Sequence, residues 1–261
     1  MKHPERWRPT KYVRRDGRLA ASDDPVHVSP ASRLVATLVA THYDRYLATY
    51  CRGRLADLGC GDVPLYAAYR QHVDDVTCID WERSAHPSVH LDIVCDLTQR
   101  LPVDDASYDV IVLSDVLEHL PNPFHLWSEA SRTLRPGGHM LLNVPFMYWL
   151  HEQPHDYYRY TEFALRRFAS LTGFEVEVLK PLGGAPEVLT DIVSKSLLGV
   201  GRVGLAMARG LQGLCLAGLR TSLGKAASRR SRDVIPLGYF MVVRKVSAPA
   251  TNGGVAATSV E

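Results

Sequence analysis

The chain has 261 residues, of which 46% are hydrophobic and 22% charged, so it can bury one substantial core with appendages. A formal net charge of +2 gives little reason to expect nucleic acid as a partner, and no nucleic-acid recognition module accompanies the basic residues. No secretion signal is evident and the five cysteines form no CxxC pair, so we expect a cytoplasmic protein with reduced thiols.

Apolar runs and turn residues predict alternating strands and helices along the chain. Ser29 and Pro30 introduce a helical pattern from Ala31 to about Cys51. Strands are predicted at 55–59, 75–80, 90–94, 108–114, 139–145, 174–180 and 236–245, and helices at 64–72, 124–135 and 162–172. This alternation predicts an α/β fold, with a mainly parallel, doubly wound sheet and helices on both faces.

The composition divides the chain into five segments. We expect a basic amino-terminal arm at 1–30, a core at 31–182, a basic apolar helical insertion at 183–235, a final core strand at 236–246 and a disordered tail at 247–261. The arm carries basic residues around Trp7 and Tyr12, and its default interpretation is a solvated leader. The alternative is an arm that closes over a phosphate-bearing acceptor.

A turn with two glycines follows the first core strand, in the segment LADLGCGDVPL at 55–65. Gly59 and Gly61 can adopt backbone angles closed to other residues, and they let a ligand approach the main chain. About 20 residues later Asp80 ends the next strand, where a carboxylate can accept hydrogen bonds from both ribose hydroxyls of a nucleotide. The layout predicts a nucleotide-cofactor pocket, with a plain strand-to-helix turn as the alternative.

The residues around this turn favour S-adenosylmethionine over a dinucleotide. A dinucleotide needs a third glycine and a helix N-terminus that is open to its pyrophosphate, but Val63 and Pro64 stand there. Asp57 adds a carboxylate that would repel a pyrophosphate and attract an ammonium group. A cofactor with a cationic methionine end therefore fits the turn better.

Several motifs occur in the order seen in class I S-adenosylmethionine-dependent methyltransferases: DLGCGDVPL, CIDW, DIVCDL, LPVDDASYDVIVLSDVLEHL, LRPGGHMLLNVPF and HEQPHDYYRYT. The chain resembles this class over about residues 30–182 and again at 236–245. More narrowly, it resembles the branch often encoded among polysaccharide and glycan biosynthesis enzymes. The resemblance implies a Rossmann-like, seven-stranded, mostly parallel sheet with an antiparallel last strand. Leu65 departs from that branch, which often has an aromatic residue there.

The cofactor-binding residues that the motifs and the resemblance imply lie at or just past the carboxyl ends of strands. They are Asp57, Gly59, Cys60, Gly61, Asp80, Trp81, Asp96, Leu97, Ser114 and Asp115. In the family an acid at the place of Asp96 meets the adenine amino group, and the alternative here is a turn cap. Trp81 either packs on the adenine or covers the sheet edge. Pro136 to Gly138 are interpreted as a helix stop and turn rather than a ligand contact.

Candidates for a general base lie in two places. Methyl transfer to an alcohol gains from a base, so a histidine near the methyl group points toward O-methylation. VLEHL places Glu118 and His119 just after the fourth strand, where they either act on the substrate or fix the loop. HEQPHDYYRYT follows the fifth strand, and we favour His155 as base over His151.

The segment HEQPHDYYRYT crowds polar and aromatic groups into a short loop. Arginine can fork onto a carboxylate, a phosphate or sugar hydroxyls, and tyrosines can stack on a sugar ring. The alternative is a loop held by internal hydrogen bonds, with Thr161 capping the next helix. The predicted substrate-binding residues are Glu118, His151, Asp156, Tyr158, Arg159 and Tyr160, and the predicted catalytic residues are His155 and His119.

A divalent metal is the other interpretation of this loop. His151, His155 and Asp156 have a spacing that can bind an ion, but magnesium prefers oxygen ligands and suits two histidines with one acid poorly. We therefore expect no metal.

The insertion is basic and apolar. Between Asp191 and Asp233 it contains no acidic residue, whereas lysines and arginines are spread through an apolar, glycine-rich sequence. Arg202 and Arg209 interrupt the longest apolar run, which argues against a membrane-spanning helix. The segment 192–232 is interpreted as a helical cap or homodimer face, or as a peripheral contact with an anionic membrane.

Taken together, the sequence predicts an S-adenosylmethionine-dependent methyltransferase that O-methylates a sugar, glycan or glycolipid hydroxyl. A second interpretation is a methyltransferase for a small aromatic or isoprenoid acceptor. A third is a regulatory or scaffold subunit that binds the cofactor without turnover.

Overall fold

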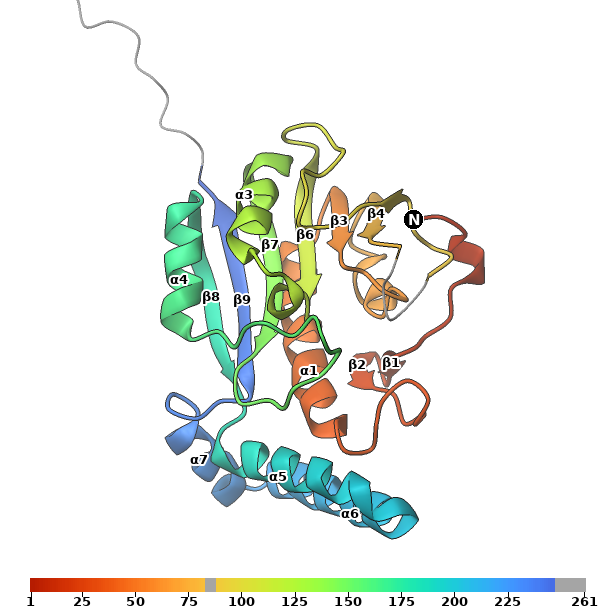
Figure 1. Ribbon diagram of the computed structural model, residues 1–261, viewed down its shortest axis with the longest axis vertical. Coiled ribbons are helices and arrows are strands. Elements are labelled where there is room, and N and C mark those ends of the chain that lie inside the picture. Colours follow the sequence, from red (N-terminus) through yellow and green to blue (C-terminus); the bar gives the residue numbers. More distant parts are fainter. Residues whose placement is uncertain (83–87, 247–261) are drawn as a thin grey trace, which may run out of the picture.

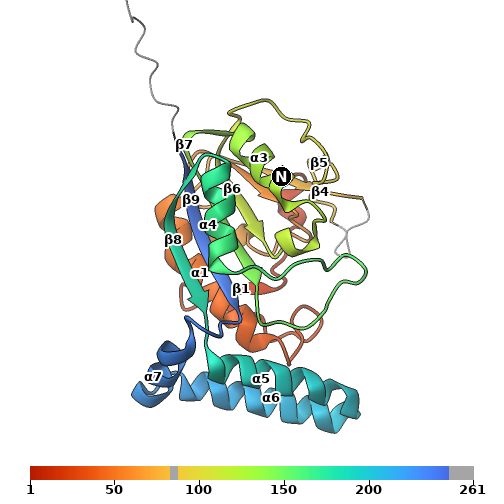
Figure 2. The same cartoon turned by 60° about the vertical axis from the view of Figure 1, so that its left-hand side comes forward.

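The computed structural model describes residues 1–82 and 88–246. A central sheet is covered by helices on both faces, and a group of helices lies at one end of it (Figures 1 and 2). The tail predicted to be disordered, 247–261, lies outside the described residues.

Seven strands form the central sheet in the order β5-β4-β3-β6-β7-β9-β8. Their bounds are β3 Arg54–Leu58, β4 Asp75–Asp80, β5 Ile93–Val94, β6 Tyr108–Ser114, β7 Leu134–Pro145, β8 Phe174–Leu182 and β9 Gly238–Lys245. Strands β5, β4, β3, β6 and β7 pair in parallel, and β9 runs antiparallel to both of its neighbours. The predicted Rossmann-like sheet with an antiparallel last strand is confirmed.

Alternation of side chains along the buried strands supplies two hydrophobic cores, one on each face of the sheet. Leu55 of β3 belongs to the core under α1 (Arg33–Tyr50) and the short α2 (Tyr66–Tyr69). Its neighbour Ala56 belongs to the core under α3 (Pro123–Thr133) and α4 (Glu162–Leu171). Because successive residues of a strand point to opposite faces, one apolar run serves both cores.

The structure confirms the predicted cap at Thr161. The Thr161 hydroxyl accepts a hydrogen bond from the amide of Ala164, and α4 begins at the next residue. This cap fixes where the loop after β7 ends and α4 begins.

Two local predictions were wrong. The helix expected at 64–72 is reduced to α2, because Val63 takes a positive φ of 55° and the chain reaches helical geometry only at Tyr66. The segment expected to be a turn at 136–138 lies within β7. A side chain at Gly138 would lie 2.9 Å from the carbonyl oxygens of Arg135 and Asp109, so this position is a close backbone approach inside the sheet.

The amino-terminal arm is folded onto the core rather than being a solvated leader. It contains a 3₁₀ turn, η1 (Pro4–Arg6), and a hairpin of β1 (Tyr12–Arg15) and β2 (Arg18–Ala21). Tyr12 and Leu19 are buried, and the Leu19 amide donates to the carboxylate of Asp44 on α1. The hairpin therefore extends the core on the α1 face (Figure 1).

The insertion forms the group of helices at one end of the sheet (Figure 2). Its elements are α5 (Ala185–Ser196), η3 (Leu197–Val200), α6 (Gly201–Gly218) and α7 (Ser222–Ser231). The buried side chain of Gln212 fastens α6 to the start of α1, since it accepts from the Leu34 amide and donates to the Ala31 carbonyl. Within the described residues, no helix has both the length and the apolar character needed to cross a bilayer.

Candidate active site

The turn with two glycines lies beside the acid that ends β4, as predicted. The Gly61 amide donates to one carboxylate oxygen of Asp80 at 2.8 Å, and the Trp81 amide donates to the other at 2.8 Å. Gly59 has a φ of 65°, and a side chain there would lie 2.6 Å from Val116. The positive φ and the close packing of Val116 both require glycine at position 59, in a turn at the carboxyl edge of the sheet, where this fold binds its ligand.

Asp57 is a buried carboxyl group at the carboxyl end of β3. Burial, reinforced by the charge of Asp80, raises the pKa of Asp57 to about 7, although the Tyr69 hydroxyl donates to it at 2.8 Å. A cation placed next to this group would favour its charged form. The geometry thus fits the predicted role toward a cationic cofactor, and Tyr69 is a partner that the sequence did not indicate.

The remaining predicted cofactor residues line the same edge of the sheet. Trp81 packs edge-on against His155, with ring centres 5.4 Å apart. Asp96 is exposed, and one of its carboxylate oxygens accepts a hydrogen bond from the Thr98 amide. Asp96 therefore caps a turn, as in the alternative interpretation, and this contact leaves its second oxygen for a ligand. Leu97 is buried beside it.

Cys60 lies in the glycine turn as a buried thiol. The neighbouring Cys78 and burial raise the pKa of Cys60 far above its ordinary value, so this thiol stays protonated. The five cysteines, all within the described ranges, are free.

A buried polar network joins the ends of β6 and β7. The Asn143 side-chain oxygen accepts from the hydroxyls of Ser114 at 2.8 Å and Tyr43 at 2.9 Å. The Asn143 amide group donates to Asp115, which also pairs with Lys11 at 2.9 Å. Ser114 and Asp115 are predicted cofactor residues, but sequence reasoning missed the other three. The one available signal was the polar Asn143 within the apolar run LLNVPF.

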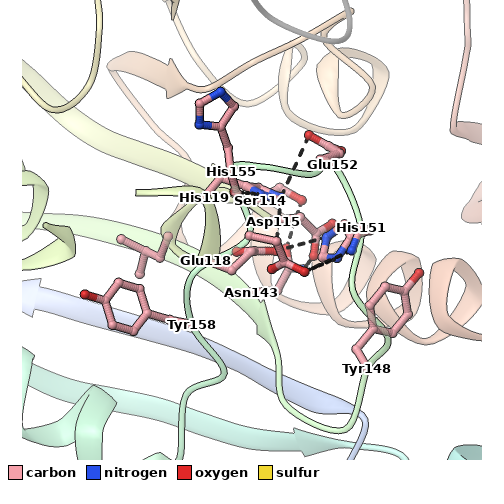
Figure 3. Close-up of polar contacts among 12 residues, drawn as sticks. Ser114, Asp115, Glu118, His119, Asn143, Tyr148, His151, Glu152, His155 and Tyr158 are labelled. Carbon is pink, nitrogen blue, oxygen red and sulfur yellow. Dashed lines mark hydrogen bonds and ion pairs between the residues drawn. The ribbon is translucent and has the colours of Figure 1, made fainter. Parts of the chain in front are cut away.

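A second cluster surrounds Glu118 and His119 of η2 (Leu117–His119). The Nε2 atoms of His119 and His151 lie 3.9 and 4.0 Å from the same oxygen of Glu118 (Figure 3). Glu118 is fully buried, and within the described residues neither of its oxygens has a hydrogen-bond partner. Burial and the nearby charge of Asp115 raise the pKa of Glu118 well above its ordinary value.

Both histidines of this cluster are fixed through their Nδ1 atoms. Nδ1 of His119 lies 2.7 Å from the carbonyl oxygen of His155, and Nδ1 of His151 lies 3.3 Å from a carboxylate oxygen of Asp156. Burial and the charge of His119 lower the pKa of His151, which favours its neutral form. The Nε2 atoms of both rings therefore face Glu118.

Internal contacts account for part of the segment HEQPHDYYRYT. Arg159 forks onto Asp156 at 2.6 and 2.7 Å, and although burial opposes it, this contact and the His151 amide lower the pKa of Asp156 to about 2. Tyr160 is buried with its hydroxyl on the Leu117 carbonyl, and Tyr158 donates to the Pro121 carbonyl. The predicted alternative, a loop held by its own hydrogen bonds, applies to these residues.

His155 differs from His119 and His151 because it is exposed. Its ring points away from the Glu118 cluster (Figure 3) and lies near the hydroxyl of Tyr157, at 3.3 Å from Nδ1. The rings of Trp81 and Tyr157 flank it. His155 and His119 thus lie close together, but the His119 ring faces Glu118 whereas the His155 ring packs against Trp81.

A cavity of about 450 Å³ adjoins the loop after β7. Its walls come from Phe146, Met147, Tyr148 and Trp149 on one side and from Asp191, Ile192, Lys195 and Ser196 of α5 on the other. The ammonium of Lys195 pairs with Asp191 and lies 3.4 Å from the centre of the Tyr148 ring. Burial lowers the pKa of Lys195 to about 8. The insertion thus builds one wall of the cavity.

The sheet order, the turn with two glycines and the acid that ends β4 define the class I methyltransferase fold. Residues 56–142 match the family model described as a methyltransferase domain. Over 108 residues the chain is 37% identical to a protein of Mycolicibacterium smegmatis, which covers 38% of this chain and 41% of that protein. Over 154 residues it is 30% identical to a protein of Mycobacterium tuberculosis, covering 49% and 55%.

Both relatives are described as probable S-adenosylmethionine-dependent methyltransferases. The chain spans about half of their length or less. Among solved structures, the cyclase SpnF superimposes with a TM-score of 0.54 at 16% identity, covering 92% of this chain and 88% of that one. This likeness concerns the fold alone. Residues 56–142 are thus similar to a methyltransferase domain, and the chain shares the fold of this class.

Proposed function

We propose that the protein transfers a methyl group from S-adenosylmethionine to a hydroxyl of a sugar, glycan or glycolipid, with His155 as general base. The observation that carries the methyl-donor part is the contact between Asp80 and the turn with two glycines, within the matched domain. The acceptor part rests on the resemblance and on the exposed histidine and tyrosines at the same edge.

Each donor-side residue has a distinct task in this proposal. The carboxylate of Asp80 accepts hydrogen bonds from the ribose hydroxyls, and the glycine turn admits the methionine portion close to the main chain. Asp57 holds the ammonium end. When bound, the cofactor supplies an activated methyl group on a sulfonium leaving group, so the protein mainly aligns the nucleophile.

Calorimetry with S-adenosylmethionine tests the donor part. Asp80→Ala removes two hydrogen bonds to a charged acceptor, so we expect binding about 100-fold weaker, or roughly 3 kcal/mol. Asp233→Ala is the matched control, because Asp233 is an exposed aspartate outside the site. An absence of binding to the wild type, or an Asp80→Ala variant that binds equally well, would remove the proposed function.

On the acceptor side, His155 takes the proton of the attacking hydroxyl while the new carbon–oxygen bond forms and the carbon–sulfur bond breaks. Its exposure and its packing on Trp81 support this role. Tyr157 and Tyr158 are exposed aromatic side chains on the same loop and suit contact with a sugar ring.

A screen of nucleotide sugars, glycolipids and small phenols with labelled cofactor tests the acceptor part. With an identified acceptor, His155→Ala should lower kcat by about 10²-fold or more, whereas the surface variant His72→Ala should not. Full activity of His155→Ala removes it as the base. Methylation of phenols alone would favour the aromatic-acceptor interpretation, and cofactor binding without turnover on any acceptor would favour a regulatory subunit.

The cavity between the loop after β7 and α5 supports a cap role for the insertion. Its volume of about 450 Å³ is in the range of small-ligand sites, and Tyr148 and Trp149 offer aromatic surface to an acceptor. Ile192→Trp would fill the cavity from the α5 side, since Ile192 lines it. We expect a higher KM for the acceptor with unchanged cofactor affinity.

A membrane-bound acceptor is the second candidate for the insertion. Val203, Met207 and Leu214 of α6 are exposed large apolar residues, and exposed arginines lie on α6 and α7. Such a surface suits peripheral contact with anionic lipid. Flotation with phosphatidylglycerol vesicles tests it: binding should be lost in Arg229→Glu/Arg230→Glu, and no flotation of the wild type removes this candidate. A concentration-dependent mass by light scattering would instead indicate a homodimer.

A further inference from the structure

We propose that Glu118, His119 and His151 bind one divalent transition-metal ion. These three side chains come from η2 and from the loop after β7, and one donor atom of each lies within 4.8 Å of the others. The set differs from His151, His155 and Asp156, the combination that the sequence spacing offered. The His155 ring points away from the cluster (Figure 3). Asp156 is held by Arg159 instead.

The donor distances are close to those that a bound ion requires. Nε2 of His119 and Nε2 of His151 lie 3.9 and 4.0 Å from Oε1 of Glu118. A tetrahedral ion with ligands at about 2.0–2.1 Å places its donors about 3.3 Å apart. Each histidine–glutamate pair therefore needs to close by only about 0.6–0.7 Å, which small side-chain rotations supply.

The hydrogen bonds behind the histidines orient them as metal ligands. Nδ1 of His119 lies 2.7 Å from the His155 carbonyl, and Nδ1 of His151 lies 3.3 Å from both the Trp149 carbonyl and the Asp156 carboxylate. With Nδ1–H on both rings, both Nε2 lone pairs face Glu118. Metal-bound histidines in proteins characteristically donate their second N–H to a carbonyl or a carboxylate in this way. Asp156 is itself fixed by a forked contact with Arg159, so the support extends one residue further.

Glu118 supplies an independent reason for a cation. Its side chain is 0% exposed, and in the described part of the structure neither carboxylate oxygen has a hydrogen-bond partner. A buried carboxylate without compensation is strongly unfavourable, so it must take a proton or a cation. A bound metal would satisfy the carboxylate and both rings together.

The donor chemistry selects the class of metal. Two imidazole nitrogens with one carboxylate suit zinc, manganese, iron or cobalt, whereas magnesium and calcium prefer an all-oxygen set. The carboxylate of Glu152 lies 3.9 Å from Nε2 of His119 and is half exposed, so it is placed to approach the same ion. If the proposed function holds, an ion here can also bind the acceptor oxygen and lower the pKa of its hydroxyl.

Equilibrium dialysis of chelator-treated protein against Zn²⁺ or Mn²⁺, followed by elemental analysis, tests the site without cofactor or acceptor. We expect one ion per chain and an affinity at least 100-fold weaker in Glu118→Gln and in His151→Asn. His155→Ala is the matched control, because the contact to His119 comes from its main-chain carbonyl. It should bind the ion like the wild type. If the metal affinity of His155→Ala were as low as that of His151→Asn, the ion would instead be bound by His151, His155 and Asp156, which contradicts the proposal.

Thermal unfolding separates metal loss from misfolding. The ion should raise the Tm of the wild type through preferential binding to the folded state, and it should leave Glu118→Gln unchanged. Without metal, the isosteric Glu118→Gln should unfold at or above the wild-type Tm, since it removes a buried acid. No stoichiometric ion in the wild type, or equal affinity in Glu118→Gln, overturns the proposal. S-adenosylmethionine calorimetry on metal-free protein then reports separately on the proposed function.

Discussion

The two halves of the candidate site are built in different ways. The donor side consists of Asp57, the turn at 59–61 and Asp80, which belong to two neighbouring parallel strands and the turn between them. The acceptor side consists of the Glu118 cluster, the loop at 146–160 and the polar network around Asn143, which also contains the predicted cofactor residues Ser114 and Asp115. Its groups come from the amino-terminal arm, α1, η2, β7 and, through the cavity wall, α5.

This difference separates what sheet topology fixes from what long-range packing fixes. On the donor side, two strands in register bring Asp57 and Asp80 to one edge with few other contacts needed. On the acceptor side, Lys11 reaches Asp115 across 104 positions of sequence, and Tyr43 reaches Asn143 across 100. The acceptor side should therefore be the more sensitive to substitutions far from it in sequence.

The largest expected effect is at Asn143. Asn143→Leu leaves the hydroxyls of Ser114 and Tyr43 without their acceptor and leaves Asp115 with Lys11 alone, so we expect a loss of about 3–5 kcal/mol in the free energy of unfolding. Tyr43→Phe removes only one hydrogen bond of the same network and should cost about 1 kcal/mol. Urea denaturation measures both. Similar small losses in the two variants would show that the network is not the support of the acceptor side.

The positions of the donor-side residues could be predicted from the sequence because these residues follow strand ends. Gly59, Gly61 and Asp80 could be placed from apolar runs and a turn, since parallel strands carry their carboxyl ends to one edge. The Tyr69 contact to Asp57 escaped prediction because it depends on where the shortened α2 begins. A β-branched residue at positive φ, Val63, caused that shortening, and local propensity argues against such a conformation.

The acceptor side could be predicted in composition but not in arrangement. The segment HEQPHDYYRYT predicted a polar loop from its composition. Its spacing did not indicate that Arg159 pairs with Asp156 or that the His151 ring faces Glu118. The arm was interpreted as a solvated leader because its charges dominate its composition. Burial of Tyr12 and the Lys11–Asp115 pair depend on tertiary packing, which overrides that local signal.

A pH dependence at Asp57 should be the next largest effect. Its folded pKa is raised to about 7 from an ordinary 3.8, so the folded state keeps a proton that the unfolded state has released. The unfolded chain therefore binds fewer protons between about pH 4 and 7, and stability falls as pH rises through this window. Asp57→Asn removes the effect. Between pH 5 and pH 8, the free energy of unfolding of Asp57→Asn should rise by about 2–4 kcal/mol relative to that of the wild type.

Urea denaturation of both proteins at pH 5 and pH 8 measures this gain. The exposed variant Asp233→Asn should show no comparable change between the two pH values. If the free energy of unfolding changed with pH by the same amount in the wild type and in Asp57→Asn, Asp57 would be ionised in the folded protein over the whole range.

A smaller effect is expected where the arm meets the donor side. The indole N–H of Trp7 donates to the Val63 carbonyl at 3.0 Å, and its ring packs edge-on against Tyr66. Trp7→Ala should loosen the glycine turn and weaken S-adenosylmethionine binding by about five- to tenfold, or roughly 1–1.4 kcal/mol. Trp7→Phe keeps most of the packing and should lose less. If Trp7→Ala bound S-adenosylmethionine as tightly as the wild type, the arm would contribute to the acceptor side only.

The smallest effect should arise at Thr161, where the loop of the acceptor side ends. Thr161→Ala removes the side-chain acceptor for the Ala164 amide and should lower the free energy of unfolding by about 1 kcal/mol. Thr161→Ser keeps a hydroxyl and should be nearly neutral. Because this cap is a local feature on the far end of the loop, S-adenosylmethionine affinity should not change in either variant. A loss of affinity would mean that the two halves of the site are coupled through α4, and that the donor side depends on more than the strands that carry it.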